Sequence, residues 1–116
     1  MVKQEIFKSA MRSAGDIFGV FDYDGDTGYF YLHNSSLDQN RRVIAALRVL
    51  TGPADFADED VEIQWTADET QVGLLIRRRL CAVIDCATKA TYGGESDADQ
   101  VFPIPPQIAA LFRAGS

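Results

Sequence analysis

Hydrophobic and polar residues alternate along most of this chain, in short runs separated by polar or glycine-containing segments. Alternation with a period of two is typical of β-strands that bury one face. The pattern predicts six strands, at residues 16–23, 28–34, 41–50, 61–66, 71–77 and 80–85. The third segment also fits a helical stripe, so residues 41–50 stay open between a strand, which the pattern favours, and a helix.

The two ends of the chain follow a different pattern. Residues 3–13 place apolar side chains three to four positions apart, which predicts a short helix that ends at Gly15. Near the C-terminus, Pro106 suits the first turn of another helix over residues 107–115. The spacing of the apolar positions in this helix predicts three that face inward, at Ile108, Leu111 and Phe112.

The segment Asp24-Gly25-Asp26-Thr27 joins two arms that are rich in aromatic and β-branched residues. An Asp-Gly pair accepts the positive φ of a tight hairpin turn, so the segment predicts chain reversal. A calcium loop counted from Asp22 has aspartates at positions 1, 3 and 5, but Thr27 replaces the glycine at position 6 and His33 the glutamate at position 12. The pattern therefore favours a turn whose carboxylates accept hydrogen bonds from backbone amides.

Together these elements predict a mainly β (α+β) fold: an antiparallel meander of five to six strands, sandwich- or barrel-like, with short terminal helices. The length of 116 residues suits a single domain that spans residues 1–116.

The composition narrows the classes of partner and the compartment. A net charge of −6 disfavours binding to nucleic acids and to anionic membranes. No apolar run approaches the roughly 20 residues that cross a bilayer, and the first residues lack the apolar core of a signal peptide, so we expect a cytoplasmic protein. Cys81 and Cys86 are five positions apart, which along one strand places them on opposite faces, and we expect reduced thiols. With one histidine in the chain, no metal site is predicted.

The aromatic residues suggest a binding surface. Tyr29 and Tyr31, with Tyr23 as a further candidate, form an aromatic strip on one face of the predicted sheet, and His33 shares that face. Tyrosine suits interfaces because it combines apolar area with a polar tip. The competing interpretation is that these rings fill or cover the core. Asp22 is expected to pair with a basic residue on a neighbouring strand.

Three consecutive arginines, Arg77, Arg78 and Arg79, form a basic cluster on an acidic chain. Two interpretations are open. The cluster is either a solvated turn or a docking point for an acidic loop, such as residues 55–60 of a second copy, which would give a symmetric dimer.

No catalytic set is recognisable, because the chain has no glycine-flanked serine, no cysteine with a placed histidine, and no phosphate or dinucleotide loop. The leading hypothesis is a non-enzymatic protein-binding or dimeric accessory module, without a cofactor, whose partner is another protein or a second copy. The alternative is a small-molecule-binding protein or enzyme with a site between the sheet and the C-terminal helix, using His33, Tyr31 and Asp22.

Several motifs resemble a small bacterial family of uncharacterised cytosolic proteins. They are "GVFDYDGDTGYFYL", "VEIQWTADETQVGLLI", "AVID" and a late "FP", over roughly residues 17–103. The family core has the form V-F-x-D-D-G-x-T-G-Y-F-Y, and the resemblance implies no particular reaction, cofactor or substrate. This chain departs from the pattern at Tyr23, where an aspartate is expected, and at Arg77-Arg78, where Asn-Gly is expected. Arginine at positive φ costs about 1 kcal/mol, so either this turn is longer or its strain is offset elsewhere.

Overall fold

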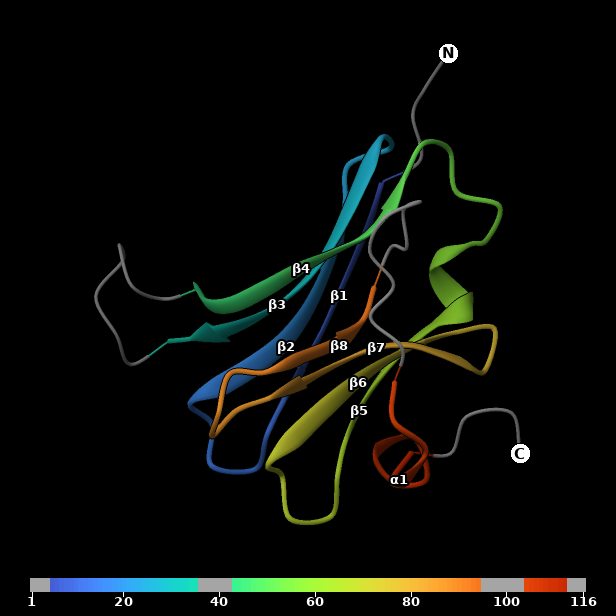
Figure 1. Ribbon diagram of the computed structural model, residues 1–116. Coiled ribbons are helices and arrows are strands. Elements are labelled where there is room, and N and C mark those ends of the chain that lie inside the picture. The colour runs from blue at the N-terminus through green and yellow to red at the C-terminus, as the bar shows by residue number, and fades with distance from the viewer. Residues whose placement is uncertain (1–4, 36–42, 95–103, 113–116) are drawn as a thin grey trace.

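The chain forms two four-stranded antiparallel sheets, each a meander in sequence order (Figure 1). The structure is a computed structural model that describes residues 5–35, 43–94 and 104–112. The first sheet contains β1 (Ile6–Met11), β2 (Ile17–Tyr23), β3 (Thr27–Asn34) and β4 (Val43–Thr51). The second sheet contains β5 (Val61–Trp65), β6 (Gln71–Ile76), β7 (Arg79–Asp85) and β8 (Thr91–Gly93).

The two sheets pack face to face around a common core, because alternate residues of each strand are apolar and buried. The first sheet contributes Ile6, Ile17, Phe21, Tyr23, Phe30 and Leu32, and the second contributes Val61, Val72, Leu74, Ala82 and Ile84. At Gly19 the sheets approach closely, since a Cβ atom there would lie 2.8 Å from a methyl carbon of Val72. The fold is therefore a sandwich, and the sheets do not close into a barrel in the part of the chain that the structure describes.

All six predicted strands are present, and residues 43–51 settle the open case as a strand. The predicted count of five to six is wrong, because the described chain has eight strands. The prediction of an N-terminal helix is wrong. The segment forms strand β1, which pairs with β2 along six residues and buries Ile6. Strand β8 lies outside the six predicted strands. Residues 3–4, 41–42 and 113–115 of the predicted segments lie outside the described residues.

The β3–β4 pairing contains two irregularities. The register shifts between Gly28 and Tyr29 and again between Leu32 and His33. Each shift inserts an extra residue on β4, and bulges of this kind increase the local twist of the strand that carries them. Strand β4, which is nine residues long and lies at the edge of the first sheet, is therefore bent rather than flat.

The C-terminal segment covers the outer side of the second sheet. Helix α1 (Pro106–Ala109) is only four residues long, so it is shorter than the predicted helix over 107–115. Phe112 is buried as predicted and packs on Gly73 of β6, where a Cβ atom would lie 2.7 Å from its ring. Leu111 was expected to face inward, but 56% of its surface is exposed. One aromatic side chain, rather than a long amphipathic helix, makes this contact.

Candidate functional site

The outer face of the first sheet carries three rows of side chains that point away from the core. The antiparallel register places one residue from each of the four strands in every row. The first row is Phe7, Asp22, Tyr29 and Arg48. The second row is Ser9, Val20, Tyr31 and Ala46. The third row is Met11, Phe18, His33 and Val43. These twelve residues are called the outer face below.

The outer face exposes large apolar side chains. In the described residues five large hydrophobic side chains are highly exposed, and four of them lie here: Phe7 (62%), Met11 (52%), Tyr29 (46%) and Val43 (57%). The fifth is Leu111, on the C-terminal segment. Single exposed apolar residues are ordinary, but several on one face of a sheet mark a candidate interaction surface. On the second sheet, by contrast, Phe112 of the C-terminal segment packs on the outer side at Gly73.

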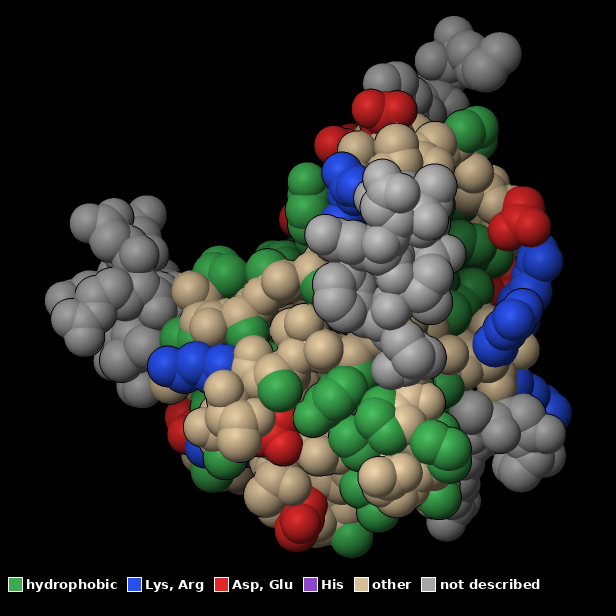
Figure 2. Space-filling view, viewed as in Figure 1, with side chains coloured by type: hydrophobic (Ala, Val, Ile, Leu, Met, Phe, Trp, Pro, Cys, Tyr) green, Lys and Arg blue, Asp and Glu red, His purple; other side chains and the backbone are tan. Residues whose placement is uncertain are grey.

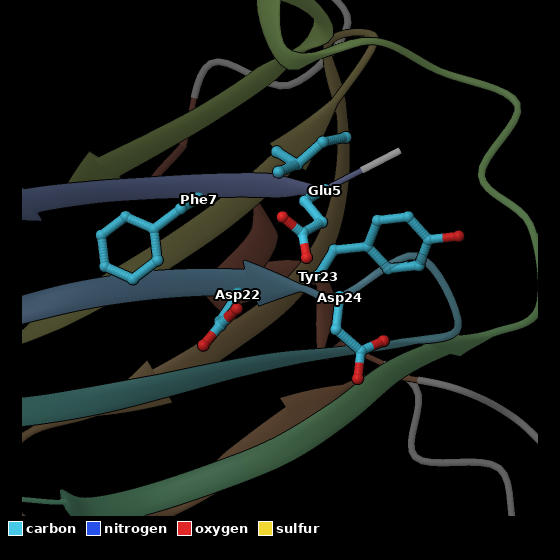
Figure 3. Close-up of a pocket in the computed structure, with 6 residues that line it drawn as sticks. Glu5, Phe7, Asp22, Tyr23 and Asp24 are labelled. Carbon is cyan, nitrogen blue, oxygen red and sulfur yellow. The ribbon is translucent and has the colours of Figure 1, made fainter. Parts of the chain in front are cut away.

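Two shallow hollows adjoin Phe7 on this side of the molecule. A mainly apolar hollow of about 340 Å³ is lined by Phe7, Ser9, Phe18, Val20, His33 and Ser35. A second hollow, of about 230 Å³, is lined by Glu5, Ile6, Phe7, Asp22, Tyr23 and Asp24. Figure 3 shows Phe7 and Asp22 near one another on neighbouring strands, whereas the Tyr23 ring extends away from them. One side of Phe7 therefore borders apolar surface and the other borders carboxylates.

The polar groups of the outer face are set among apolar rings. Burial and the nearby charge of Asp22 raise the pKa of the Tyr31 phenol, so it stays neutral and can donate a hydrogen bond. The rings of Phe18 and His33 are 6.0 Å apart between centroids. Such a surface offers aromatic contact and a few hydrogen bonds, which suits protein recognition.

The turn between β2 and β3 uses the side chain of one aspartate to hold the backbone. The Asp24 carboxylate accepts hydrogen bonds from the amides of Asp26 and Thr27, both at 2.8 Å, and Gly25 has a φ of +96°. The predicted chain reversal is confirmed. The described residues contain no group of three histidine, cysteine or acidic side chains placed to hold a metal ion.

The arginine cluster forms the turn between β6 and β7. Arg77 and Arg78 occupy a two-residue turn with φ values of 53° and 66°, so the turn is not longer than the family pattern implies. The Arg77 guanidinium lies 3.8 Å from the Asp55 carboxylate and 3.7 Å from that of Asp60, and it donates to the Asp55 carbonyl oxygen. Figure 2 shows basic and acidic side chains side by side at the right margin, where the β6–β7 turn lies in Figure 1. The loop predicted to dock from a second copy is thus engaged by Arg77 within the same chain.

The structure divides the predicted site residues into two groups. Tyr29, Tyr31 and His33 share the outer face, as expected, and the register places Asp22 on it as well. Arg77, Arg78 and Arg79 belong to the second sheet and form a separate cluster. The prediction that Tyr23 joins the aromatic strip is wrong. Its side chain is buried in the core, and its hydroxyl donates to the Gly52 carbonyl oxygen at 2.7 Å.

The expected ionic partner of Asp22 is not on a directly adjacent strand. Its neighbours in the row are Phe7 and Tyr29, and the basic residue Arg48 lies two strands away. Sequence reasoning missed the contributions of β1 and β4. The alternation Phe7, Ser9, Met11 was a usable signal for β1, whereas no signal in the sequence gives the register that places Arg48 in this row.

The alternative site, between the sheet and the C-terminal helix, does not form from its proposed residues. The C-terminal segment packs on the second sheet at Gly73. Asp22, Tyr31 and His33 lie on the outer face of the first sheet, with the core between them and that segment.

Comparison with known protein families gives a match over most of the chain. A family model described as an uncharacterized protein conserved in bacteria (DUF2251) matches residues 1–101. No curated protein and no solved structure matches the chain. In the residues described here, no helix is both long and apolar enough to cross a membrane.

Proposed function

We propose that this chain, which belongs to the DUF2251 family of uncharacterised bacterial proteins, is a non-enzymatic protein-binding module. Its binding site is the outer face of the first sheet. The observation that carries the proposal is that four of the five highly exposed large hydrophobic side chains of the described residues gather there.

The chemistry of the outer face supports protein as the ligand. Tyr29, Tyr31 and Phe18 offer large rigid apolar surfaces, and the phenol hydroxyls supply hydrogen bonds at little entropic cost. The hollow of about 340 Å³ beside Phe7 and Val20 is shallow and mainly apolar, so it suits one side chain of a partner. The Asp24 carboxylate of the adjoining turn bonds the turn's own backbone, which argues against its use in a hydrolytic carboxylate pair.

We place this function in the cytoplasm. Cys81 and Cys86 are not bonded to one another, which supports a reducing compartment, and the net charge of −6 keeps the protein away from anionic membrane surfaces.

Affinity capture from the bacterium that encodes the protein tests the proposal. The baits are the wild type, Met11→Glu on the outer face, and Leu111→Glu as a control of similar exposure away from it (52% against 56%). We expect the wild type and the control to capture one protein in stoichiometric amount, either another protein or untagged copies of the chain itself. We expect Met11→Glu not to capture it. Recovery of the same proteins by all three baits, or of none by any, would show that the outer face is not a binding site.

A further inference from the structure

We infer that the partner which covers the outer face is a second copy of the chain, stacked sheet on sheet about a two-fold axis parallel to the strands and midway between β2 and β3. This inference rests on the proposed function, because it names the partner of the same surface. Three observations carry it: the symmetry of the rows, the arrangement of the charges, and the size of the face.

The rows of the outer face are complementary to themselves. A two-fold rotation about this axis exchanges β1 with β4 and β2 with β3 and keeps each row opposite itself. In the second row, Tyr31 then lies over Val20 of the other copy, whose side chain is already buried within its own chain (2% exposed), and Ser9 faces Ala46. In the third row, Phe18 faces His33 and Met11 faces Val43. Each contact occurs twice, and none opposes two like charges.

The charged residues all fall in the first row, where the same rotation also matches them. Asp22 comes to face Tyr29 of the other copy, so the carboxylate can accept a hydrogen bond from the phenol. Arg48 comes to lie over Phe7, an arrangement that attracts a guanidinium to the ring face. Adjacent strands are about 4.8 Å apart, so Arg48 also reaches the Asp22 carboxylate beside Phe7. An acidic chain of net charge −6 thus presents, on this one face, a self-complementary set of charges.

The face is large enough for a stable contact. Four strands at about 4.8 Å spacing and six to nine residues at about 3.3 Å each give roughly 20 Å by 20–30 Å in projection. The rough surface of the side chains makes the accessible area larger than this projection. It therefore approaches the roughly 800 Å² per partner that a stable dimer buries. A two-fold contact also closes on itself, so both exposed faces are satisfied in one step.

Sedimentation of the full chain between micromolar and millimolar concentration is the first test. We expect a mass of twice 12.8 kDa for the wild type and for Leu111→Glu. Met11→Glu places a carboxylate opposite Val43 at two equivalent sites, so we expect its dissociation constant to rise at least about 100-fold. Circular dichroism confirms that this exposed variant remains folded. A wild type that is still monomeric at about 1 mM overturns the inference.

A charge exchange tests the geometry through substitutions that leave the core untouched. Asp22→Arg places two basic groups together, and Arg48→Asp places two acidic groups together, so each variant alone is expected to dimerise at least about ten-fold more weakly. In an equal mixture of the two variants, both contacts of a mixed dimer pair opposite charges. We therefore expect the mixture to recover dimerisation. A mixture that is no better than its components overturns this arrangement of the copies.

The capture experiment separates failure of this inference from failure of the proposed function. Suppose that the wild type is monomeric and captures another protein, whereas Met11→Glu does not. The inference of a second copy is then overturned, and the protein-binding function stands. A monomeric wild type that captures nothing overturns both. Protection of Phe7 and Met11 from carbene labelling in such a monomer would identify another part of the same chain as the cover.

Discussion

The turn between β6 and β7 gives a sharp test of how the chain tolerates arginine at positive φ. Arg77 and Arg78 have almost the same backbone conformation, with φ values of 53° and 66°. This conformation costs a residue with a side chain about 1–2 kcal/mol of folding free energy. Glycine avoids that cost, but it loses more conformational entropy on folding, which costs about 0.5–1 kcal/mol. The difference predicts that Arg78→Gly raises the free energy of unfolding by about 0.5–1 kcal/mol.

The same substitution at Arg77 has a second consequence. Its guanidinium contacts the Asp55 and Asp60 carboxylates and donates to the Asp55 carbonyl oxygen, all of which glycine removes. Half of the Arg77 side chain is exposed (55%), so solvent screens the ion pairs, and together with the hydrogen bond they contribute about 1 kcal/mol. We therefore expect Arg77→Gly to be neutral or slightly destabilising, which puts it about 1 kcal/mol below Arg78→Gly.

Urea unfolding followed by the fluorescence of the single tryptophan, Trp65, measures both variants. With a slope of about 1–2 kcal/mol per molar urea, Arg78→Gly should raise the midpoint by roughly 0.5 M. Lys89→Gly is the control, since Lys89 also has a positive φ (64°), in the turn after β7. The reasoning fails if Lys89→Gly stabilises while Arg78→Gly does not, or if Arg77→Gly stabilises as much as Arg78→Gly.

Three further predictions concern the packing and the acid stability of the sandwich. Gly73→Ala should lower the free energy of unfolding by about 1–3 kcal/mol in urea, because its Cβ atom would lie 2.7 Å from the Phe112 ring. Trp65→Phe should lower it by about 1 kcal/mol, measured by circular dichroism, because it removes the hydrogen bond from the indole to the Ala10 carbonyl oxygen. Acid should also destabilise the fold, because hydrogen bonds lower four carboxyl pKa values. The stabilisation from these hydrogen bonds is complete above about pH 4, near the carboxyl pKa values of the unfolded chain. It is lost as the pH falls through the lower pKa values of the folded chain, so melting temperatures should drop between about pH 4 and 2. The four groups are Asp16, whose pKa is about 2, Asp68, Glu69 and Asp85.

The sequence predicted strands well where alternation was long and clear, as in β5 and β6. It failed at residues 6–11 because Ile6, Phe7, Ala10 and Met11 fit a helical stripe as well as an alternating one. Pairing with β2 along six residues decides for the strand. β8 is three residues long, which is too short to show a period. Tertiary pairing, rather than local preference, determines both elements.

The candidate site was predictable only in its central part. Tyr29, Tyr31 and His33 alternate on one strand, so their common face follows from the period of two. The wrong placement of Tyr23 arose because the length of the turn sets which residues of β2 share a face with β3, and the register pairs Tyr29 with Asp22 instead. The contact of Arg77 with Asp55 was beyond sequence reasoning, since it depends on how two loops meet across the fold.

The two bulges on β4 decide how this protein behaves when it is crowded. A long, flat, apolar strand at the rim of a sheet invites other chains to add to it one after another, and fibres grow in this way. β4 is long and apolar, but its two bulges, opposite Gly28–Tyr29 and Leu32–His33 of β3, spoil the template for such open-ended growth. At high concentration we therefore expect clear solutions of discrete particles rather than gels or thioflavin-positive filaments.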